Sequence, residues 1–265
     1  MIDFDKGTGL MDRPEILHRI FFPRREWPLE SRPRNGMTHF VEVAEGISIG
    51  CRFYPARTDG PNVLYFHGNG EIATDYDYVA PLYQERGLNL FVADYRGYGE
   101  SDGSPTCSAM IKDAHPIFHG FVSFLDARGY GGDRFVMGRS LGSAPAIEVA
   151  YRYQGQLKGL IVESGFASSR NQFARLGVSY LFEGVEGAIG FGNDLKIKEI
   201  RIPTLVIHGE EDEIIPAGEG RALYTLSAAT KKEALFVPGA GHNDLLERSL
   251  TRYMETIETF TRAAR

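Results

Sequence analysis

The sequence predicts an α/β protein with a mostly parallel β-sheet. Short runs rich in β-branched and aromatic residues alternate with helical stretches of ten or more residues, the pattern of successive βαβ units. The 265 residues include 31 glycines without a G-x-y period, which fits many tight turns between strands and helices. No linker, low-complexity segment or internal repeat interrupts this pattern. We therefore expect residues 1–265 to form a single α/β domain.

The N-terminal region is expected to precede the parallel part of the sheet. Residues 1–38 read as an arm rich in arginine and proline, with a short helix near residues 15–21. Two strand-like runs follow at residues 39–43 and 47–54. They are joined by A-E-G, so their spacing predicts a β-hairpin with a short glycine-containing loop.

Apolar runs then alternate with helical stretches. Continuous apolar runs are typical of strands that are buried on both faces of a parallel sheet. The expected strands are 62–68, 88–95, 133–138, 157–164, 202–209 and 233–239, and the expected helices are 71–86, 108–128, 140–153, 217–228 and 244 to the C-terminus.

Residues 165–199 interrupt the alternation. Their apolar side chains fall at i, i+3, i+7, i+8 and i+12, the spacing of one helical face. Open parallel sheets bind ligands at the carboxyl edge of their strands. We therefore expect a small helical insert, or lid, over that edge and over the active site. The face consists of Phe173, Leu176, Tyr180, Leu181 and Val185.

Composition narrows the classes of function. The net charge of −6 argues against a nucleic-acid partner, because phosphate binding needs a basic surface. No run approaches the ~20 apolar residues of a membrane span, and the N-terminus lacks the pattern of a secretory signal. Cys51 and Cys107 are too few for a zinc pattern and read as reduced thiols. We expect a cytoplasmic protein with no metal, no cofactor and no membrane span; no feature indicates an oligomeric state.

A nucleophile motif stands where a strand meets a helix. G-R-S-L-G at residues 138–142 follows an apolar strand and opens a helix, which is the context that the G-x-S-x-G nucleophile elbow requires. The glycines allow the sharp turn that lifts the Ser140 hydroxyl above the sheet. A glycine-rich strand-to-helix turn without chemistry is the alternative interpretation.

A serine nucleophile needs a base, and the base needs an orienting acid. In this arrangement the acid follows the serine in the chain and the histidine comes last. Asp212 lies in the acidic run 210–213 after a buried strand, and His242 lies in a glycine-flanked loop after the final strand. Glu163, at the end of another strand, is the rival acid. His67 and His208 end buried strands, and we expect their rings to bond nearby loop carbonyls.

Two backbone N–H groups are expected to stabilise the oxyanion that forms during acyl transfer. One is that of Leu141, at the start of the helix after the nucleophile. The other is that of Asn69 in the loop H-G-N-G, with Gly70 as the alternative.

Four side chains are candidates for substrate binding: Arg139, Phe166, Phe173 and Tyr180. The aromatic side chains, together with those of Phe182 and Phe191, could form an apolar pocket wall or serve only in packing. Arg139 could instead pair with Glu163 or another acid.

These motifs together resemble the α/β-hydrolases, and more narrowly their Bem46/ABHD13/ABHD17-like branch of serine hydrolases. The matching segments are FFPRRE, LYFHGNG, VADYRGYGESDGSP, FVMGRSLGS, IVESGFAS, PTLVIHGEEDEIIP and PGAGHND. The resemblance implies an eight-stranded, mostly parallel sheet with one antiparallel strand, and hydrolysis through an acyl-enzyme. It also implies that Asp94 and Arg96 belong to a structural motif that supports the oxyanion loop.

The expected function is therefore cleavage of small carboxylic esters or thioesters by a Ser140–His242–Asp212 triad. Another triad hydrolase on the same fold, such as a peptidase or a C–C hydrolase, is the first alternative, because a fold does not fix its chemistry. A non-catalytic protein that binds small molecules is the second.

Overall fold

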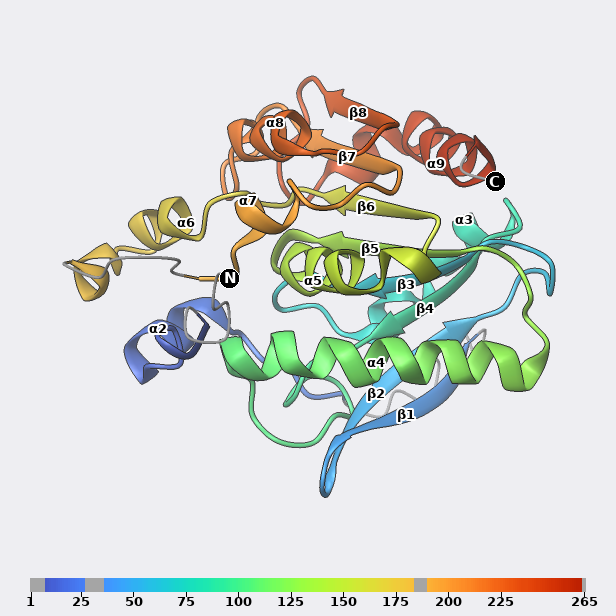
Figure 1. Ribbon diagram of the computed structural model, residues 1–265, viewed down its shortest axis with the longest axis horizontal. Coiled ribbons are helices and arrows are strands. Elements are labelled where there is room, and N and C mark those ends of the chain that lie inside the picture. Colours follow the sequence, from blue (N-terminus) through green and yellow to red (C-terminus); the bar gives the residue numbers. More distant parts are fainter. Residues whose placement is uncertain (1–7, 27–35, 184–189, 264–265) are drawn as a thin grey trace.

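Eight strands form one sheet in the computed structural model, which describes residues 8–26, 36–183 and 190–263 (Figure 1). The strand order is β1-β2-β4-β3-β5-β6-β7-β8. Strand β2 is antiparallel to both of its neighbours, and the pairs from β4 to β8 are all parallel. The strands are β1 Met37–Ala44, β2 Ile47–Tyr54, β3 Asn62–Phe66, β4 Asn89–Ala93, β5 Arg134–Arg139, β6 Gly159–Glu163, β7 Thr204–Gly209 and β8 Lys232–Val237.

Helices cover both faces of this sheet. Alternate residues of a strand point to opposite faces, so Leu64 and Phe66 join the core on one face while Val63 and Tyr65 join the core on the other. The first core is closed by α4, α5 and α8, and the second by α3 and α9. These helices are α3 Ala80–Gln84, α4 Cys107–Arg128, α5 Ser143–Tyr153, α8 Ala217–Leu226 and α9 Leu245–Ala263.

The expected alternation of strands and helices is confirmed, with one helix broken. The helix expected over residues 71–86 is two short pieces, the 3₁₀ helix η1 (Ala73–Asp77) and α3. Pro81 lies in the first turn of α3, because proline has no N–H and cannot continue a helix from the preceding turn. The hairpin of β1 and β2 is as expected, and Gly46 in its turn has φ +68°.

The insert after β6 consists of short helical pieces rather than one continuous helix. They are α6 (Ser169–Arg175), the 3₁₀ helix η4 (Ser179–Phe182) and α7 (Asn193–Lys196). Phe173 is buried, whereas Tyr180 is 57% exposed. The helical face expected from the sequence therefore does not extend through the insert as one surface. Val185 lies outside the described residues.

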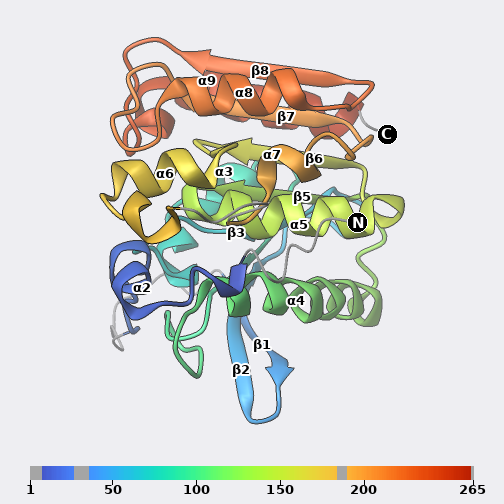
Figure 2. The same ribbon diagram turned by 60° about the vertical axis from the view of Figure 1, so that its left-hand side comes forward.

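The N-terminal segment packs beside this insert. Helix α2 (Pro14–Ile20) lies next to α6 in both views of the molecule (Figures 1 and 2). The Arg19 guanidinium donates a hydrogen bond to the Leu176 carbonyl at 2.9 Å. Ile16 and Ile20 are buried in the core on the α4 side of the sheet. The segment is thus part of the packed structure, whereas the sequence predicted an extended arm with one short helix.

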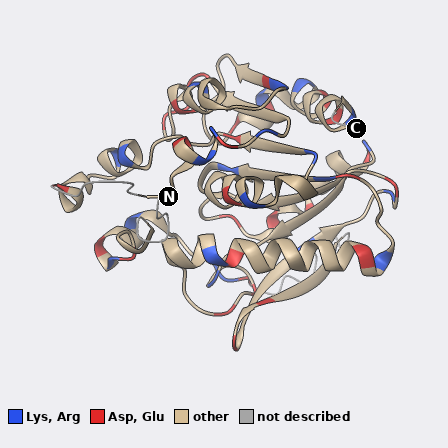
Figure 3. Cartoon of the chain, viewed as in Figure 1, with Lys and Arg blue, Asp and Glu red and all other residues tan. Residues whose placement is uncertain are grey.

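Basic and acidic residues are interspersed along the helices, as Figure 3 shows for α4 and α9. Among the described residues, no helix has both the length and the apolar character that a membrane crossing requires. Both cysteines are buried and free. The absence of a nucleic-acid partner remains a prediction.

Candidate active site

The sharp turn after β5 places Ser140 at the carboxyl edge of the sheet. Ser140 has φ +53°, a left-handed conformation that a residue with a side chain seldom adopts. The glycines on either side allow the close packing around it. A Cβ on Gly138 would lie 2.2 Å from the Gly142 carbonyl oxygen, and a Cβ on Gly142 would lie 2.1 Å from that of Phe66. The strand-turn-helix geometry of a nucleophile elbow is therefore present.

Three side chains from three loops meet at this edge. The His242 Nε2 lies 2.9 Å from the Ser140 Oγ, and the His242 Nδ1 lies 2.7 Å from the Asp212 Oδ2. Ser140 follows β5, Asp212 follows β7 and His242 follows β8. Parallel strands bring their carboxyl ends to one edge, so residues far apart in the chain converge there.

The Asp212 carboxylate is held in place by backbone and ring groups. Its Oδ1 accepts hydrogen bonds from the N–H groups of Ile214 (3.0 Å) and Ile215 (2.7 Å). His208 Nε2 lies 3.3 Å from Oδ2 and 2.7 Å from the Ile215 carbonyl, as expected for a structural histidine. Burial raises the pKa of Asp212, but the bonds from His208 and His242 outweigh it and lower that pKa well below its ordinary range. The carboxylate stays ionised next to His242.

The loop after β3 is tightly bonded, and its residue Asn69 lines the same cavity as Ser140. His67 donates from Nδ1 to the Gly68 carbonyl at 2.8 Å, also as expected, and its Nε2 lies 3.1 Å from Asp94 Oδ1. The same Asp94 oxygen accepts the Ala73 N–H at 2.8 Å. Asp94 therefore supports this loop, as the resemblance implied. The guanidinium of Arg96 forms two bonds of 2.7 Å with Asp113 of α4, which gives no support to a role for Arg96 in holding the loop.

The Asn69 side chain fastens this loop to the N-terminal segment. Its amide Nδ2 donates to the Ile20 carbonyl, and its Oδ1 accepts the Phe22 N–H at 3.0 Å and the Tyr98 hydroxyl at 2.7 Å. The backbone N–H of Asn69 is the one expected to face the oxyanion, so one residue links the N-terminal segment to the proposed donor. Leu141, the other proposed donor, adjoins Ser140.

Ser140 opens into a cavity of about 600 Å³ with largely apolar walls. Two of the residues predicted to bind substrate, Phe166 and Phe173, line it, together with Leu141 and Asn69. The N-terminal segment also contributes a wall, which was not predicted from the sequence. The segment FFPRRE, which begins at Phe21 and resembles the family, was the feature of the sequence that could have indicated this wall. Arg19, Ile20 and Phe22 of the N-terminal segment form this wall. Leu176, Phe191, Ile214 and Ile215 line the cavity beside it.

The other two candidate substrate residues lie elsewhere. Arg139 is not among the residues that line the Ser140 cavity; it pairs with Glu71 and with Glu163, the second pairing being one that the sequence left open. Tyr180 is exposed and also lies outside the cavity lining. Neither placement supports the expectation that these two side chains bind substrate.

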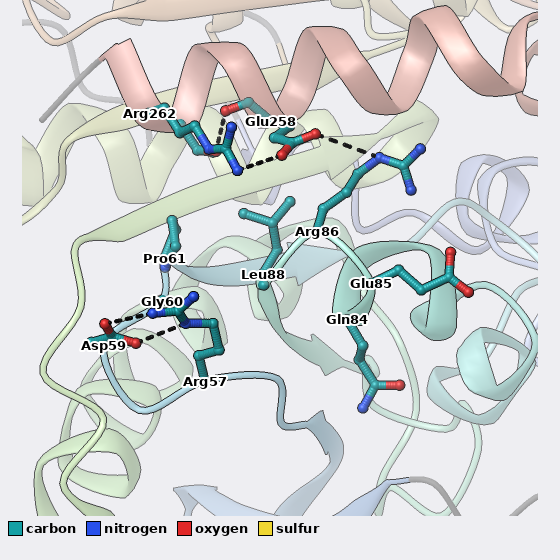
Figure 4. A pocket seen from close by; sticks show the side chains of 12 residues that line it. Arg57, Asp59, Gly60, Pro61, Gln84, Glu85, Arg86, Leu88, Glu258 and Arg262 are labelled. Carbon is teal, nitrogen blue, oxygen red and sulfur yellow. Dashed lines mark hydrogen bonds and ion pairs between the residues drawn. The ribbon is translucent and has the colours of Figure 1, made fainter.

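Another cavity, of about 340 Å³, lies at the opposite edge of the sheet, near the starts of β3 and β4 (Figure 4). Several of its charged side chains are paired: Arg57 with Asp59, and both Arg86 and Arg262 with Glu258. It is remote from the three residues that meet at the carboxyl edge. Among the residues that the structure describes, no group of three or more His, Cys, Asp or Glu side chains is placed to hold a metal ion.

The sheet, the elbow and the order of the three loops define an α/β-hydrolase. Solved structures share this fold: the esterase Pf2001 of Pyrococcus furiosus is 17% identical with a TM-score of 0.74, covering 92% of this chain and 98% of that one. A soluble variant of the monoglyceride lipase of Saccharomyces cerevisiae is 17% identical with a TM-score of 0.68, covering 90% and 99%. Family models described as serine aminopeptidase S33 and serine hydrolase (FSH1) match residues 60–186 and 133–243.

Two relatives are similar to this chain in sequence over most of its length, with a higher identity than the solved structures that share the fold. The human α/β-hydrolase domain-containing protein 17B is 31% identical over 248 residues, which cover 89% of this chain and 79% of that protein. Protein 17C of Xenopus tropicalis is 29% identical over 264 residues, covering 97% and 79%. The chain belongs to this family of α/β-hydrolase domain-containing proteins, and therefore to the serine hydrolases.

Proposed function

We propose that this serine hydrolase cleaves carboxylic esters or thioesters through an acyl-enzyme formed on Ser140. The observation that carries the proposal is the continuous hydrogen-bond chain from Ser140 through His242 to Asp212, with Ser140 lining a largely apolar cavity. The apolar walls suit an acyl group, and the serine hydroxyl lies where a carbonyl carbon would enter.

The geometry suggests the role of each residue. His242, held by Asp212, takes the proton of the Ser140 hydroxyl as that oxygen attacks the carbonyl carbon. The backbone N–H groups of Leu141 and Asn69 stabilise the resulting oxyanion. His242 then protonates the leaving alcohol or thiol, and afterwards activates the water that releases the acid.

Ser140→Ala tests this proposal. Removing the nucleophile should lower kcat on a p-nitrophenyl ester and on an acyl thioester by about 10⁴–10⁶-fold. A fluorophosphonate probe should label the wild-type enzyme at Ser140 and leave the variant unlabelled. Ser179→Ala, at an exposed serine of η4, is the matched control and should keep wild-type rates. Unchanged activity in Ser140→Ala would refute the proposed mechanism, and an unlabelled wild type would favour a binding protein.

One observation favours peptide cleavage as a second candidate function. The family model described as serine aminopeptidase S33 matches residues 60–186, which include the elbow. The same triad can cleave an amide, provided that His242 protonates the leaving amine. Aminoacyl p-nitroanilides assayed beside esters of the same acyl group separate the two functions. Faster cleavage of the anilides would replace the ester proposal with this one.

A further inference from the structure

The side chain of Arg139 is buried although it stands next to the nucleophile. Only 13% of it is exposed, and it borders a second cavity of about 250 Å³ that is also lined by His242 but not by Ser140. Successive residues at the end of a strand point to opposite sides. Arg139 therefore lies behind the catalytic histidine, outside the cavity expected to hold substrate.

The guanidinium group contacts two loops and the end of one strand. Its Nη1 pairs with Glu71 Oε1, and its Nε lies 3.2 Å from Glu163 Oε1 at the end of β6. Its Nη2 donates to the backbone carbonyl of His242 at 2.9 Å and to Asn243 Oδ1 at 3.1 Å. A planar guanidinium presents several N–H donors in a fixed geometry, which suits a group that must hold several partners at once.

The contact with Glu71 reaches the oxyanion loop. The other oxygen of Glu71, Oε2, accepts the Gly68 N–H at 2.9 Å and the Tyr76 hydroxyl at 2.8 Å. Gly68 directly precedes Asn69, whose backbone N–H is one of the proposed oxyanion donors. A chain of two side chains, Arg139 and Glu71, thus runs from the histidine loop to the oxyanion loop.

The network is charged. Burial lowers the pKa of Arg139, but Glu71 and Glu163 outweigh it and raise that pKa above its ordinary value. Burial raises the pKa of Glu71, but Arg139 and His67, with the hydrogen bonds from Gly68 and Tyr76, outweigh it and lower that pKa. The other oxygen of Glu163, Oε2, accepts a hydrogen bond from the Tyr253 hydroxyl at 2.6 Å. Removing one member of such a buried ion pair lowers stability strongly, because the other charge is left buried without a partner.

We propose that Arg139 is a positioning residue that fixes the His242 loop and the oxyanion loop relative to each other. This inference rests on the proposed function, since it assigns Arg139 to the same reaction. Arg139 acts through the His242 carbonyl and through Glu71, without touching the substrate. Its removal changes the alignment of His242 and Asn69 with Ser140 and leaves the walls of the substrate cavity in place.

Arg139→Ala is the first test, read out by the rate of fluorophosphonate labelling at Ser140 and by kcat and KM on a short p-nitrophenyl ester. A misplacement of about 1 Å at a catalytic group costs about 10²-fold in rate, so kcat and the labelling rate should both fall by about that factor with KM little changed. Arg134→Ala is the matched control. Arg134 stands at the other end of β5 and pairs with Asp126.

Chemical rescue distinguishes positioning from a general structural role. Truncating Arg139 opens space beside the second cavity, between Glu71 and Glu163, where a free guanidinium ion fits. Guanidinium chloride at millimolar, non-denaturing concentrations should restore about tenfold of the lost labelling rate in Arg139→Ala. It should leave wild type and Ser140→Ala unchanged, and urea at the same concentration should not rescue.

Two further variants keep the proposal falsifiable if Arg139→Ala does not fold. Arg139→Lys retains the charge and should keep a higher labelling rate than Arg139→Gln. Glu71→Gln should lower the labelling rate, and combining it with Arg139→Gln should cost less than the product of the two single losses, because the two residues act in one chain.

The outcomes separate this proposal from the proposed function. Folded Arg139 variants that are labelled as fast as wild type would overturn the positioning role alone. A loss of labelling that neither guanidinium nor Arg139→Lys restores would also overturn it. A wild type that no fluorophosphonate labels at Ser140 would overturn the proposed function, and the role of Arg139 with it.

Discussion

Two buried carboxylates near the active site hold different partners. Asp212 accepts a bond from His242 Nδ1 at 2.7 Å, and its other oxygen accepts two backbone N–H groups. Glu163, the rival acid in the sequence, lies against Arg139 and the Tyr253 hydroxyl. Asp212 is thus placed to orient the imidazole, whereas Glu163 is placed to neutralise a guanidinium. Residue type alone could not separate these two roles.

Asp212→Asn should therefore abolish most activity without displacing its neighbours. The asparagine side chain nearly matches the shape of aspartate but can present an N–H to His242 Nδ1, which favours the wrong tautomer, so kcat should fall by about 10⁴-fold. Ester hydrolysis at neutral pH measures this. Glu211→Gln, at the exposed acidic residue next to it, should keep wild-type rates. Equal losses in both variants would contradict the assignment of Asp212 as the acid.

At the scale of elements, the loop after β3 joins two parts of the molecule. Asn69 in this loop lines the same cavity as Ser140, and its side chain bonds to the Ile20 carbonyl and the Phe22 N–H of the N-terminal segment. Helix α2 also bonds to the insert through Arg19 and Leu176. The N-terminal segment and the insert therefore line the cavity together, and the loop after β3 is bonded to the N-terminal segment.

Asn69→Ala should weaken that connection while keeping the backbone N–H. It removes three side-chain hydrogen bonds, each worth about 0.5–1.5 kcal/mol, so the free energy of unfolding should fall by roughly 2–4 kcal/mol. The ester kcat/KM should fall as well, because both the cavity wall and the oxyanion loop lose a support. Urea unfolding and ester kinetics measure the two effects.

Tyr98→Phe is the control for Asn69→Ala. It removes the hydroxyl that donates to Asn69 and accepts the Phe22 N–H at 3.0 Å, but it leaves both bonds between Asn69 and the N-terminal segment. Its loss of stability and of activity should be smaller. If Tyr98→Phe proved as damaging as Asn69→Ala, the two bonds from Asn69 to the N-terminal segment would not be what holds that segment in place.

Over the whole molecule, the features that depend on residues close together in the chain could be predicted from the sequence. Apolar runs marked the strands of the parallel sheet, and the glycines around Ser140 marked the elbow, because each depends on neighbours in the chain. The order of the three loops predicted that Asp212 and His242 would approach Ser140. The interruption of the helix at 71–86 was readable from Pro81.

Tertiary contacts could not be predicted in the same way. Residues 8–22 carry seven apolar side chains, but nothing in their pattern states which surface they cover. The pairing of Arg139 with Glu71 joins residues 68 positions apart. A charged residue next to a nucleophile reads equally well as a substrate contact or as an ion pair. Only the packed structure places its guanidinium behind His242.

The N-terminal segment is part of the common core, and this leads to a prediction about stability. Ile16 of α2 is fully buried, and it belongs to the same apolar cluster as Leu64 of β3 and Phe118 of α4. Ile16→Ala should lower the free energy of unfolding by about 2–5 kcal/mol, from lost burial and the cavity left behind. Glu15→Ala, at the exposed neighbour, should change it by less than about 0.5 kcal/mol. Equal stability of both variants in urea unfolding would mean that α2 is a loosely attached arm, and that the cavity wall it forms is not fixed by the core.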